Sequence, residues 1–144
     1  MFSILGDVSG AQVLDLYCGT GALGIEALSR GATSATLVDR RIALARRNVE
    51  ALGLSERCEV IRADVTQFLR RQGERFDLVF CDPPYRLADR LEGELDPLIQ
   101  KRLAKDGRVI AESASRRPLS LSLRLVAERR YGDTVVRVHG PQTP

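Results

Sequence analysis

The chain has 144 residues, of which 44% are hydrophobic and 28% charged, with a net charge of +3 at neutral pH, values ordinary for a globular protein with a real core. No apolar run approaches the length that spans a bilayer, the N-terminus lacks a charged segment ahead of an apolar signal core, and three cysteines with one histidine show no zinc-ligand spacing. We therefore expect one cytoplasmic domain over residues 1–144, a monomer with no metal and no membrane contact.

The basic residues are nearly all arginine, with only two lysines among 22. Arginine binds phosphate through two hydrogen bonds and stacks on bases, so RNA is a plausible partner. Genome composition explains the same bias, and a net charge this small creates no strong field. The charge is therefore mild support for RNA binding.

The first predicted strand, 12–17, leads into a glycine-rich loop and a predicted helix over 21–30. Gly19, Gly21 and Gly24 have the spacing G-x-G-x-x-G, in which glycines permit a tight turn and a close backbone approach to a ligand. Free N–H groups at the start of the helix favour anionic or polar ligand atoms. The motif alone is weak evidence, but here a strand precedes it and a helix follows.

Two further strands, at 34–39 and 58–62, are each followed by a predicted helix, at 40–52 and 64–71. Asp39 ends the first of these strands, where an acid can accept hydrogen bonds from both ribose hydroxyls of a nucleotide-like ligand. Asp64 follows the second strand, where it could cap the next helix, accept a hydrogen bond from an adenine amino group, or do both.

The strand predicted at 76–82 stops at Asp82-Pro83-Pro84-Tyr85. Proline lacks the N–H that a central strand needs, so a rigid turn follows at the carboxyl end of the sheet, where α/β proteins bind ligands. An acid, two prolines and an aromatic ring at this place favour a clamp for a flat polar group such as a nucleobase. A proline-stiffened loop with a capping aspartate is the alternative.

The remaining pattern predicts a helix at 87–104, a strand at 107–112 and a hairpin formed by 121–130 and 134–139. Alternating strands and helices predict an α/β fold, a mostly parallel central sheet with helices on both faces. The C-terminal antiparallel hairpin is typical of class I Rossmann-like methyltransferases and speaks against an NAD-binding module. Acids that end or nearly end four strands (Asp15, Asp39, Asp64 and Asp82) predict a cleft for a cationic, adenosine-bearing ligand.

Motifs along essentially the whole chain resemble the bacterial RsmD-like methyltransferases. They are the run 15–24, the run Glu26-Ala-Leu-Ser-Arg-Gly-Ala32, Asp82-Pro-Pro-Tyr85 and Tyr131-Gly-Asp-Thr134. The resemblance implies an rRNA-processing transferase that methylates the N2 amine of a guanine in 16S rRNA. Its cofactor would be S-adenosyl-L-methionine, its product S-adenosyl-L-homocysteine, and its partner ribosomal RNA or an assembling small subunit.

The resemblance also implies roles for the cofactor-binding residues. The loop backbone would pack on the amino-acid part of the cofactor, Asp15 would orient the loop and reach the ammonium group, Asp39 would bind the ribose and Asp64 the adenine amine. The cysteine beside the loop is expected mainly to pack, as a small hydrophobe. The complete expected set is Asp15, Cys18, Gly19, Thr20, Gly21, Asp39, Arg40, Asp64, Val65 and Asp82.

Four catalytic residues are expected: Asp82, Pro83, Pro84 and Tyr85. Hydrogen bonds from the guanine amine to the Asp82 carboxylate and the Pro83 carbonyl would aim its lone pair at the methyl group, and Tyr85 would stack on the extruded base. The acid does not exclude adenine-N6 or cytosine-N4 methylation of DNA, but no separate target-recognition domain is visible, which favours RNA.

The resemblance has one departure. Members of the family usually carry several tens of residues, basic in character, before the point that corresponds to Met1, so this chain is expected to lack a segment that helps to bind RNA. A cofactor-binding remnant without turnover therefore stays a further alternative.

Overall fold

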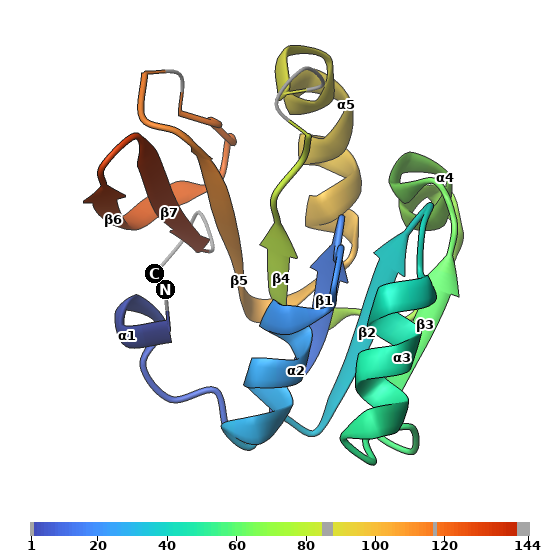
Figure 1. Ribbon diagram of the computed structural model, residues 1–144. Coiled ribbons are helices and arrows are strands. Elements are labelled where there is room, and N and C mark those ends of the chain that lie inside the picture. The colour runs from blue at the N-terminus through green and yellow to red at the C-terminus, as the bar shows by residue number, and fades with distance from the viewer. Residues whose placement is uncertain (1, 85–87, 117, 141–144) are drawn as a thin grey trace.

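The computed structural model describes residues 2–84, 88–116 and 118–140. These residues form a sheet of seven strands in the order β3-β2-β1-β4-β5-β7-β6, with helices on both faces (Figure 1). The strands are β1 (Gln12–Leu16), β2 (Ser34–Asp39), β3 (Cys58–Arg62), β4 (Phe76–Cys81), β5 (Leu103–Ala114), β6 (Arg124–Tyr131) and β7 (Thr134–Gly140). The helices are α1 (Phe2–Leu5), α2 (Ala22–Ser29), α3 (Ala43–Ala51), α4 (Val65–Arg70) and α5 (Ala88–Lys101).

The first five strands pair in parallel, as the alternation of strands and helices predicts. From β1 the chain adds β2 and β3 on one side of the sheet and then crosses to β4 on the other. The strand order therefore reverses between β1 and β4, and α/β proteins bind ligands outside the carboxyl ends of the strands at such a point.

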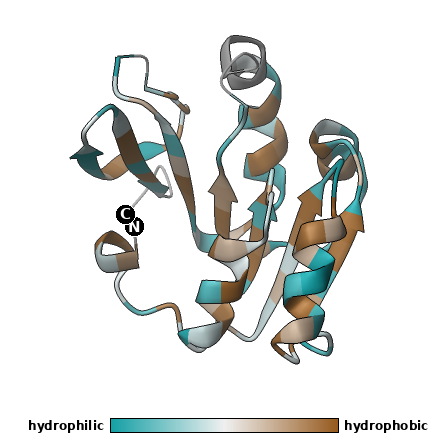
Figure 2. Cartoon of the chain, viewed as in Figure 1, coloured by the Kyte–Doolittle hydropathy of each residue, from teal (hydrophilic) through white to brown (hydrophobic). Residues whose placement is uncertain are grey.

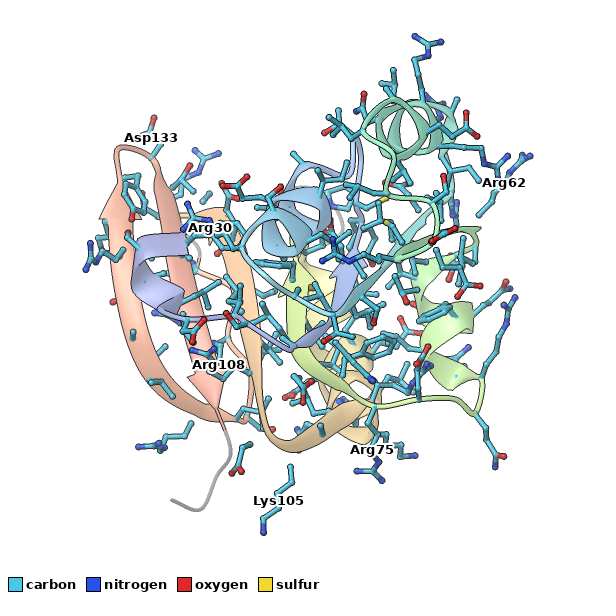
Figure 3. All side chains as sticks on the ribbon, turned by 90° about the horizontal axis from the view of Figure 1, so that it is seen from below. Arg30, Arg62, Arg75, Lys105, Arg108 and Asp133 are labelled. Atoms are coloured by element: carbon cyan, nitrogen blue, oxygen red, sulfur yellow. The ribbon has the colours of Figure 1, made fainter. Side chains whose placement is uncertain are left out.

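The sheet is buried between two hydrophobic layers, so its central strands are apolar on both faces. All but one residue of β4 is buried, and Figure 2 shows hydrophobic residues along this strand. Val13 and Phe80 point to the layer that holds α1, α2 and α3. Leu14 and Val79 point to the layer that holds α4 and α5. In Figure 3 several charged side chains, Arg62 and Lys105 among them, extend from the periphery.

The antiparallel end of the sheet confirms the predicted C-terminal hairpin. β7 pairs with β6 across the turn Gly132-Asp133, where Gly132 takes a positive φ of 58°. After this turn β7, the last strand in sequence, inserts between β5 and β6 and pairs with both of them.

Three predicted elements around β5 and β6 have different bounds in the structure. The helix predicted at 87–104 ends at Lys101 (residue 87 lies outside the described residues), and the strand predicted at 107–112 extends over Leu103–Ala114. Leu103 leaves the helix because it pairs with Phe76 of β4. The first hairpin strand begins at Arg124 instead of residue 121, because Leu121 and Leu123 are buried in the core beside α5.

No helix in the described part of the chain is long and apolar enough to cross a bilayer.

Candidate functional site

The glycine-rich loop joins β1 to α2 through a tight turn in which the Gly21 N–H donates to the Cys18 carbonyl over 2.8 Å. Gly19 and Gly21 take positive φ values of 57° and 82°. Tyr17 also has a positive φ, of 58°, although it carries a large side chain. Backbone strain of this kind persists only where the surrounding structure imposes it, and it is concentrated at functional sites.

The second and third glycines of the motif allow α2 to pack closely on β2. A Cβ atom added at Gly21 would lie 2.8 Å from Leu37 Cδ1, and one added at Gly24 would lie 2.3 Å from Leu37 Cδ2. Around Gly19, in contrast, the space is open. The motif therefore combines two packing glycines with one glycine whose surroundings leave room for a ligand.

Three side chains hold this loop in place. Asp39 Oδ2, at the end of β2, accepts a hydrogen bond of 2.9 Å from the Gly19 N–H. Asp15 Oδ2, in β1, accepts one of 3.1 Å from the Gly24 N–H. Asn48 Nδ2, in α3, donates one of 3.0 Å to the Thr20 carbonyl. Asn48 was not among the predicted site residues, and its place between the buried residues Ala45 and Val49 is the sequence signal for an anchoring role.

The Asp15 carboxyl group is almost fully buried, with 2% of the residue exposed. Burial raises its pKa from 3.8 to about 7, and the charges of Asp82 and Asp39 act in the same direction, while the hydrogen bond from Gly24 opposes them. A buried carboxylate without a cationic partner destabilises the folded chain. A cation in the cleft would compensate this charge, so the donor set fits a positively charged ligand.

We expect Asp15→Asn to stabilise the ligand-free protein at pH 8. A folded-state pKa of about 7 means that the native state binds more protons than the unfolded state between pH 4 and 7, so stability falls as the pH rises through this window. The variant removes this loss, up to about 4 kcal/mol by linkage. Thermal melting from pH 4 to 8 checks the prediction, and a variant whose melting temperature falls with pH as steeply as the parent's would contradict it.

The carboxyl end of β3 carries an ion pair between Arg40 and Asp64. Asp64 also caps α4 by accepting a hydrogen bond of 3.1 Å from the Gln67 N–H, which confirms the capping interpretation. The Arg40 hydrogen bond, followed by that from Gln67, lowers the pKa of Asp64. Because the Arg40 side chain is 77% exposed, the pair adds little stability and can open to a ligand.

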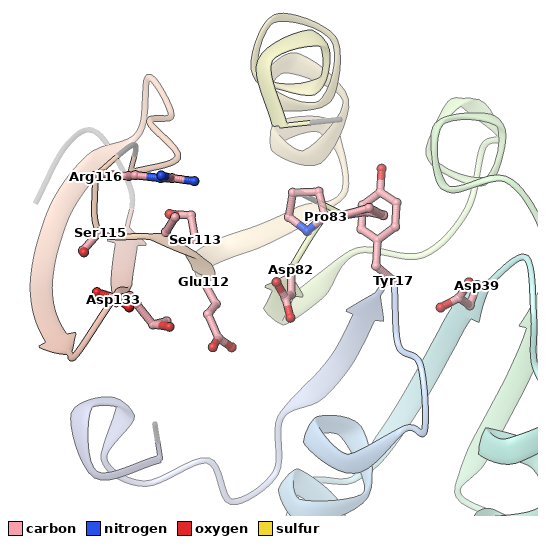
Figure 4. A pocket seen from close by; sticks show the side chains of 12 residues that line it. Tyr17, Asp39, Asp82, Pro83, Glu112, Ser113, Ser115, Arg116 and Asp133 are labelled. Carbon is pink, nitrogen blue, oxygen red and sulfur yellow. The ribbon is translucent and has the colours of Figure 1, made fainter. Parts of the chain in front are cut away.

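A cavity of about 780 Å³ lies at the carboxyl ends of the strands (Figure 4). One side of it is formed by Tyr17 and Asp39, the middle by Asp82-Pro83-Pro84 after β4, and the other side by the ends of β5 and β7. Residues of this last side are Glu112, Ser113, Ala114, Ser115, Arg116, Asp133 and Thr134. A volume of this size suits a small-molecule or nucleobase site.

Asp82 is exposed toward the cavity. The cleft walls still remove part of the water around its carboxylate, and this desolvation, together with the negative charge of Glu112, raises its pKa to about 6. The group is therefore mostly ionised at neutral pH but can accept a proton there, which is the behaviour of a general base.

The predicted site residues lie at four places. Asp39, Asp82, Pro83 and Pro84 line the cavity, and Cys18 to Gly21 form the loop next to it. Asp15 and Val65 are buried in the core, and Arg40 and Asp64 form the ion pair after β3. Cys18 is buried too, and burial raises the pKa of its thiol to about 12, which disfavours the reactive thiolate. Tyr85 lies outside the described residues.

Several residues of the cavity were not predicted from the sequence. Tyr17, which follows β1, and Glu112, near the end of β5, are two of them. The segment from Ser113 to Arg116 and the turn residue Asp133 approach the cavity because β7 pairs with β5. That pairing joins residues distant in sequence, so only the Tyr-Gly-Asp-Thr turn gave a signal.

The described residues contain no group of three or more His, Cys, Asp or Glu side chains that could hold a metal ion.

Strand order, glycine loop and cavity together define a Rossmann-like methyltransferase fold. The chain belongs to the family described as conserved hypothetical protein 95, whose model matches residues 1–140. The predicted resemblance to the RsmD-like proteins is thereby confirmed.

The curated relatives include proteins named as rRNA methyltransferases of the large subunit and of the small subunit. A Bacillus subtilis protein, provisionally named as the rRNA methyltransferase YlbH, is 35% identical over 120 residues, covering 78% of this chain and 65% of that protein. The Escherichia coli ribosomal RNA small subunit methyltransferase D is 38% identical over 78 residues, covering 53% of this chain and 39% of that protein. The chain thus spans less than two thirds of the length of either relative.

Among solved structures, a conserved hypothetical protein of Streptococcus pyogenes superposes with a TM-score of 0.87 at 28% identity, covering 97% of this chain and 92% of that one.

Proposed function

We propose that residues 1–144 form a single methyltransferase domain that uses S-adenosyl-L-methionine to methylate the N2 amine of a guanine in small-subunit rRNA. The observation that carries the proposal is the juxtaposition of two half-sites. A glycine loop anchored to Asp39 lies directly beside a cavity that Asp82, Pro83 and Pro84 bound.

The cofactor half would lie over the loop, between β1 and β3. S-adenosyl-L-methionine, when bound, supplies an electrophilic methyl group on a positively charged sulfur. The open space at Gly19 admits a close backbone approach, and the Asp39 carboxylate can accept from ribose hydroxyls. The buried charge of Asp15 favours a cationic ligand. Arg40 and Val65 border the place where Asp64 would accept from the adenine amine.

The target half would lie at the end of β4. An exocyclic guanine amine is a weak nucleophile, because its lone pair is delocalised into the ring. Hydrogen bonds to the Asp82 carboxylate and the Pro83 carbonyl would hold both N–H groups and direct the lone pair at the methyl group. Asp82 would then take the proton that nitrogen loses. Holding amine and methyl in line can contribute about 7–11 kcal/mol to lowering the barrier.

The names of the two relatives, both rRNA methyltransferases, support an rRNA substrate. In this proposal the partner is 16S rRNA or an assembling small subunit, the chain acts as a monomer in the cytoplasm, and the product is S-adenosyl-L-homocysteine.

Methyl transfer from radiolabelled S-adenosyl-L-methionine tests the proposal. Small ribosomal subunits that lack guanine-N2 methylation, large subunits and duplex DNA are compared as acceptors, and digested nucleosides are identified by mass spectrometry. We expect N2-methylguanosine in the small-subunit RNA alone. Methylation of adenine or cytosine in DNA would support the alternative enzyme, and cofactor binding with no turnover on any acceptor would support a remnant.

A further inference from the structure

Two carboxylates stand next to each other in the cavity. The parallel register of β4 and β5 pairs Cys81, the last residue of β4, with Ala111. Asp82 directly follows Cys81, and Glu112 directly follows Ala111 on β5. Register partners on adjacent parallel strands point to the same face, about 4.8 Å apart in backbone spacing. Figure 4 shows both side chains extending to the same side of the strand ends, and both line the cavity.

The sheet fixes the position of Glu112. On its other side, β5 pairs with β7, and Glu112 lies opposite Val136 in that ladder. The residue therefore lies inside the sheet and not on a free loop, which restricts where its carboxylate can reach. The negative charge of Glu112 acts on Asp82 strongly enough to be the second cause of its raised pKa, so the two carboxylates share one environment.

Two adjacent acceptors match one kind of base edge. On its Watson–Crick edge guanine has two adjacent hydrogen-bond donors, the N1–H group and the N2 amine. Adenine and cytosine present one amine beside a ring nitrogen that is an acceptor. A second carboxylate would accept a hydrogen bond from guanine N1–H. In adenine and cytosine the same carboxylate would face the lone pair of the ring nitrogen, so the carboxylate and the ring nitrogen would both lack a donor.

We propose that Glu112 selects guanine, by accepting the N1–H of the base whose N2 amine is held at Asp82. This inference rests on the proposed function and adds to it a residue that excludes adenine and cytosine. Glu112 would repel the ring nitrogen of adenine or cytosine as well as attract the N1–H of guanine, and specific sites commonly combine the two effects.

Glu112→Gln tests the inference, with Glu59→Gln as a matched control on the exposed side of β3. The acceptors are small ribosomal subunits that lack guanine-N2 methylation, and kcat/KM is measured from pH 5 to 9. We expect Glu112→Gln to lower kcat/KM about 5- to 10-fold, since the amide oxygen can still accept the N1–H but the acceptor is no longer charged. Glu59→Gln should leave kcat/KM within about twofold.

The pH profile separates recognition from a structural role. Without the Glu112 charge the pKa of Asp82 falls, so the acidic limb of the kcat/KM profile moves to lower pH. Asp39, Arg116 and Asp133 also line the cavity and are unchanged in this variant, so the movement reports Glu112. Glu112→Asp, which keeps the charge on a shorter side chain, should lose kcat/KM with less movement of this limb, and it serves as the test if Glu112→Gln does not fold.

The outcomes distinguish this inference from the proposed function. A wild-type protein that methylates no nucleic acid, or an adenine or cytosine instead, would overturn both. A guanine-specific wild type whose kcat/KM and acidic limb are unchanged in Glu112→Gln would overturn the role of Glu112 alone.

Discussion

Asp82→Ala is expected to lower the rate of methyl transfer about 1,000-fold and to leave the affinity for S-adenosyl-L-methionine within a few-fold of the parent. The carboxylate lies in the target half of the cavity, where it would hold the amine and take its proton, and general-base groups contribute about 10²–10⁴-fold. Single-turnover methylation and calorimetric titration of the cofactor measure the two quantities separately.

Asp82→Asn separates geometry from charge, since the amide oxygen still accepts a hydrogen bond but cannot take a proton. In the wild type, transfer should decline as the pH falls through about 6, where Asp82 becomes protonated, and this decline should be absent from the residual activity of the asparagine variant. Glu59→Ala, on the exposed side of β3 and outside the residues that line the cavity, is the control. Transfer by Asp82→Ala within threefold of the parent would show that this mechanism is wrong.

Arg102→Ala is expected to lower the free energy of unfolding by about 3–5 kcal/mol. The guanidinium is buried, with the residue 6% exposed, and it donates hydrogen bonds to the carbonyls of Phe68, Arg71 and Glu74 at the end of α4 and the loop after it. It also lies 4.8 Å from the Phe68 ring centroid. Alanine would leave these carbonyls without a partner and open a cavity beside the ring.

Urea unfolding of Arg102→Ala beside Arg70→Ala provides the comparison. Arg70 lies on α4 and pairs with Glu94 at the surface, with 59% of its side chain exposed, so its loss should cost no more than about 1 kcal/mol. Gly73 approaches the same guanidinium closely, since an added Cβ would lie 2.8 Å from Arg102 Nη2. Equal losses in the two arginine variants would contradict the structural role of Arg102.

Local sequence signals were enough to predict the parallel part of the fold. The apolar runs that became β1, β2 and β4 are buried strands. The glycine-rich loop follows β1, Asp39 ends β2 and Asp82-Pro83 follows β4, so their limits were predicted to within one residue. Gly19, Gly21 and Gly24 were identified by spacing, and the structure gives the physical reason for two of them, the contact with Leu37.

Features that depend on contacts between distant segments were missed. Nothing near Arg102 in sequence reveals that it binds carbonyls around residue 70. The helix before it was predicted to continue to 104, because the pairing of Leu103 with Phe76 that ends it also joins distant segments. Glu112 becomes a neighbour of Asp82 only through the β4–β5 register. The strain at Tyr17 likewise follows from the loop that Asp39 and Asn48 hold from other elements.

The central claim is that the cleft over the glycine loop binds S-adenosyl-L-methionine. Calorimetric titration with S-adenosyl-L-methionine and with NAD, on the wild type and on Asp39→Ala, tests it most directly. We expect the wild type to bind S-adenosyl-L-methionine and not NAD, and Asp39→Ala to bind it at least about tenfold more weakly, because a hydrogen-bonding carboxylate is lost. Binding of NAD instead, or of S-adenosyl-L-methionine with equal affinity in both proteins, would contradict the account.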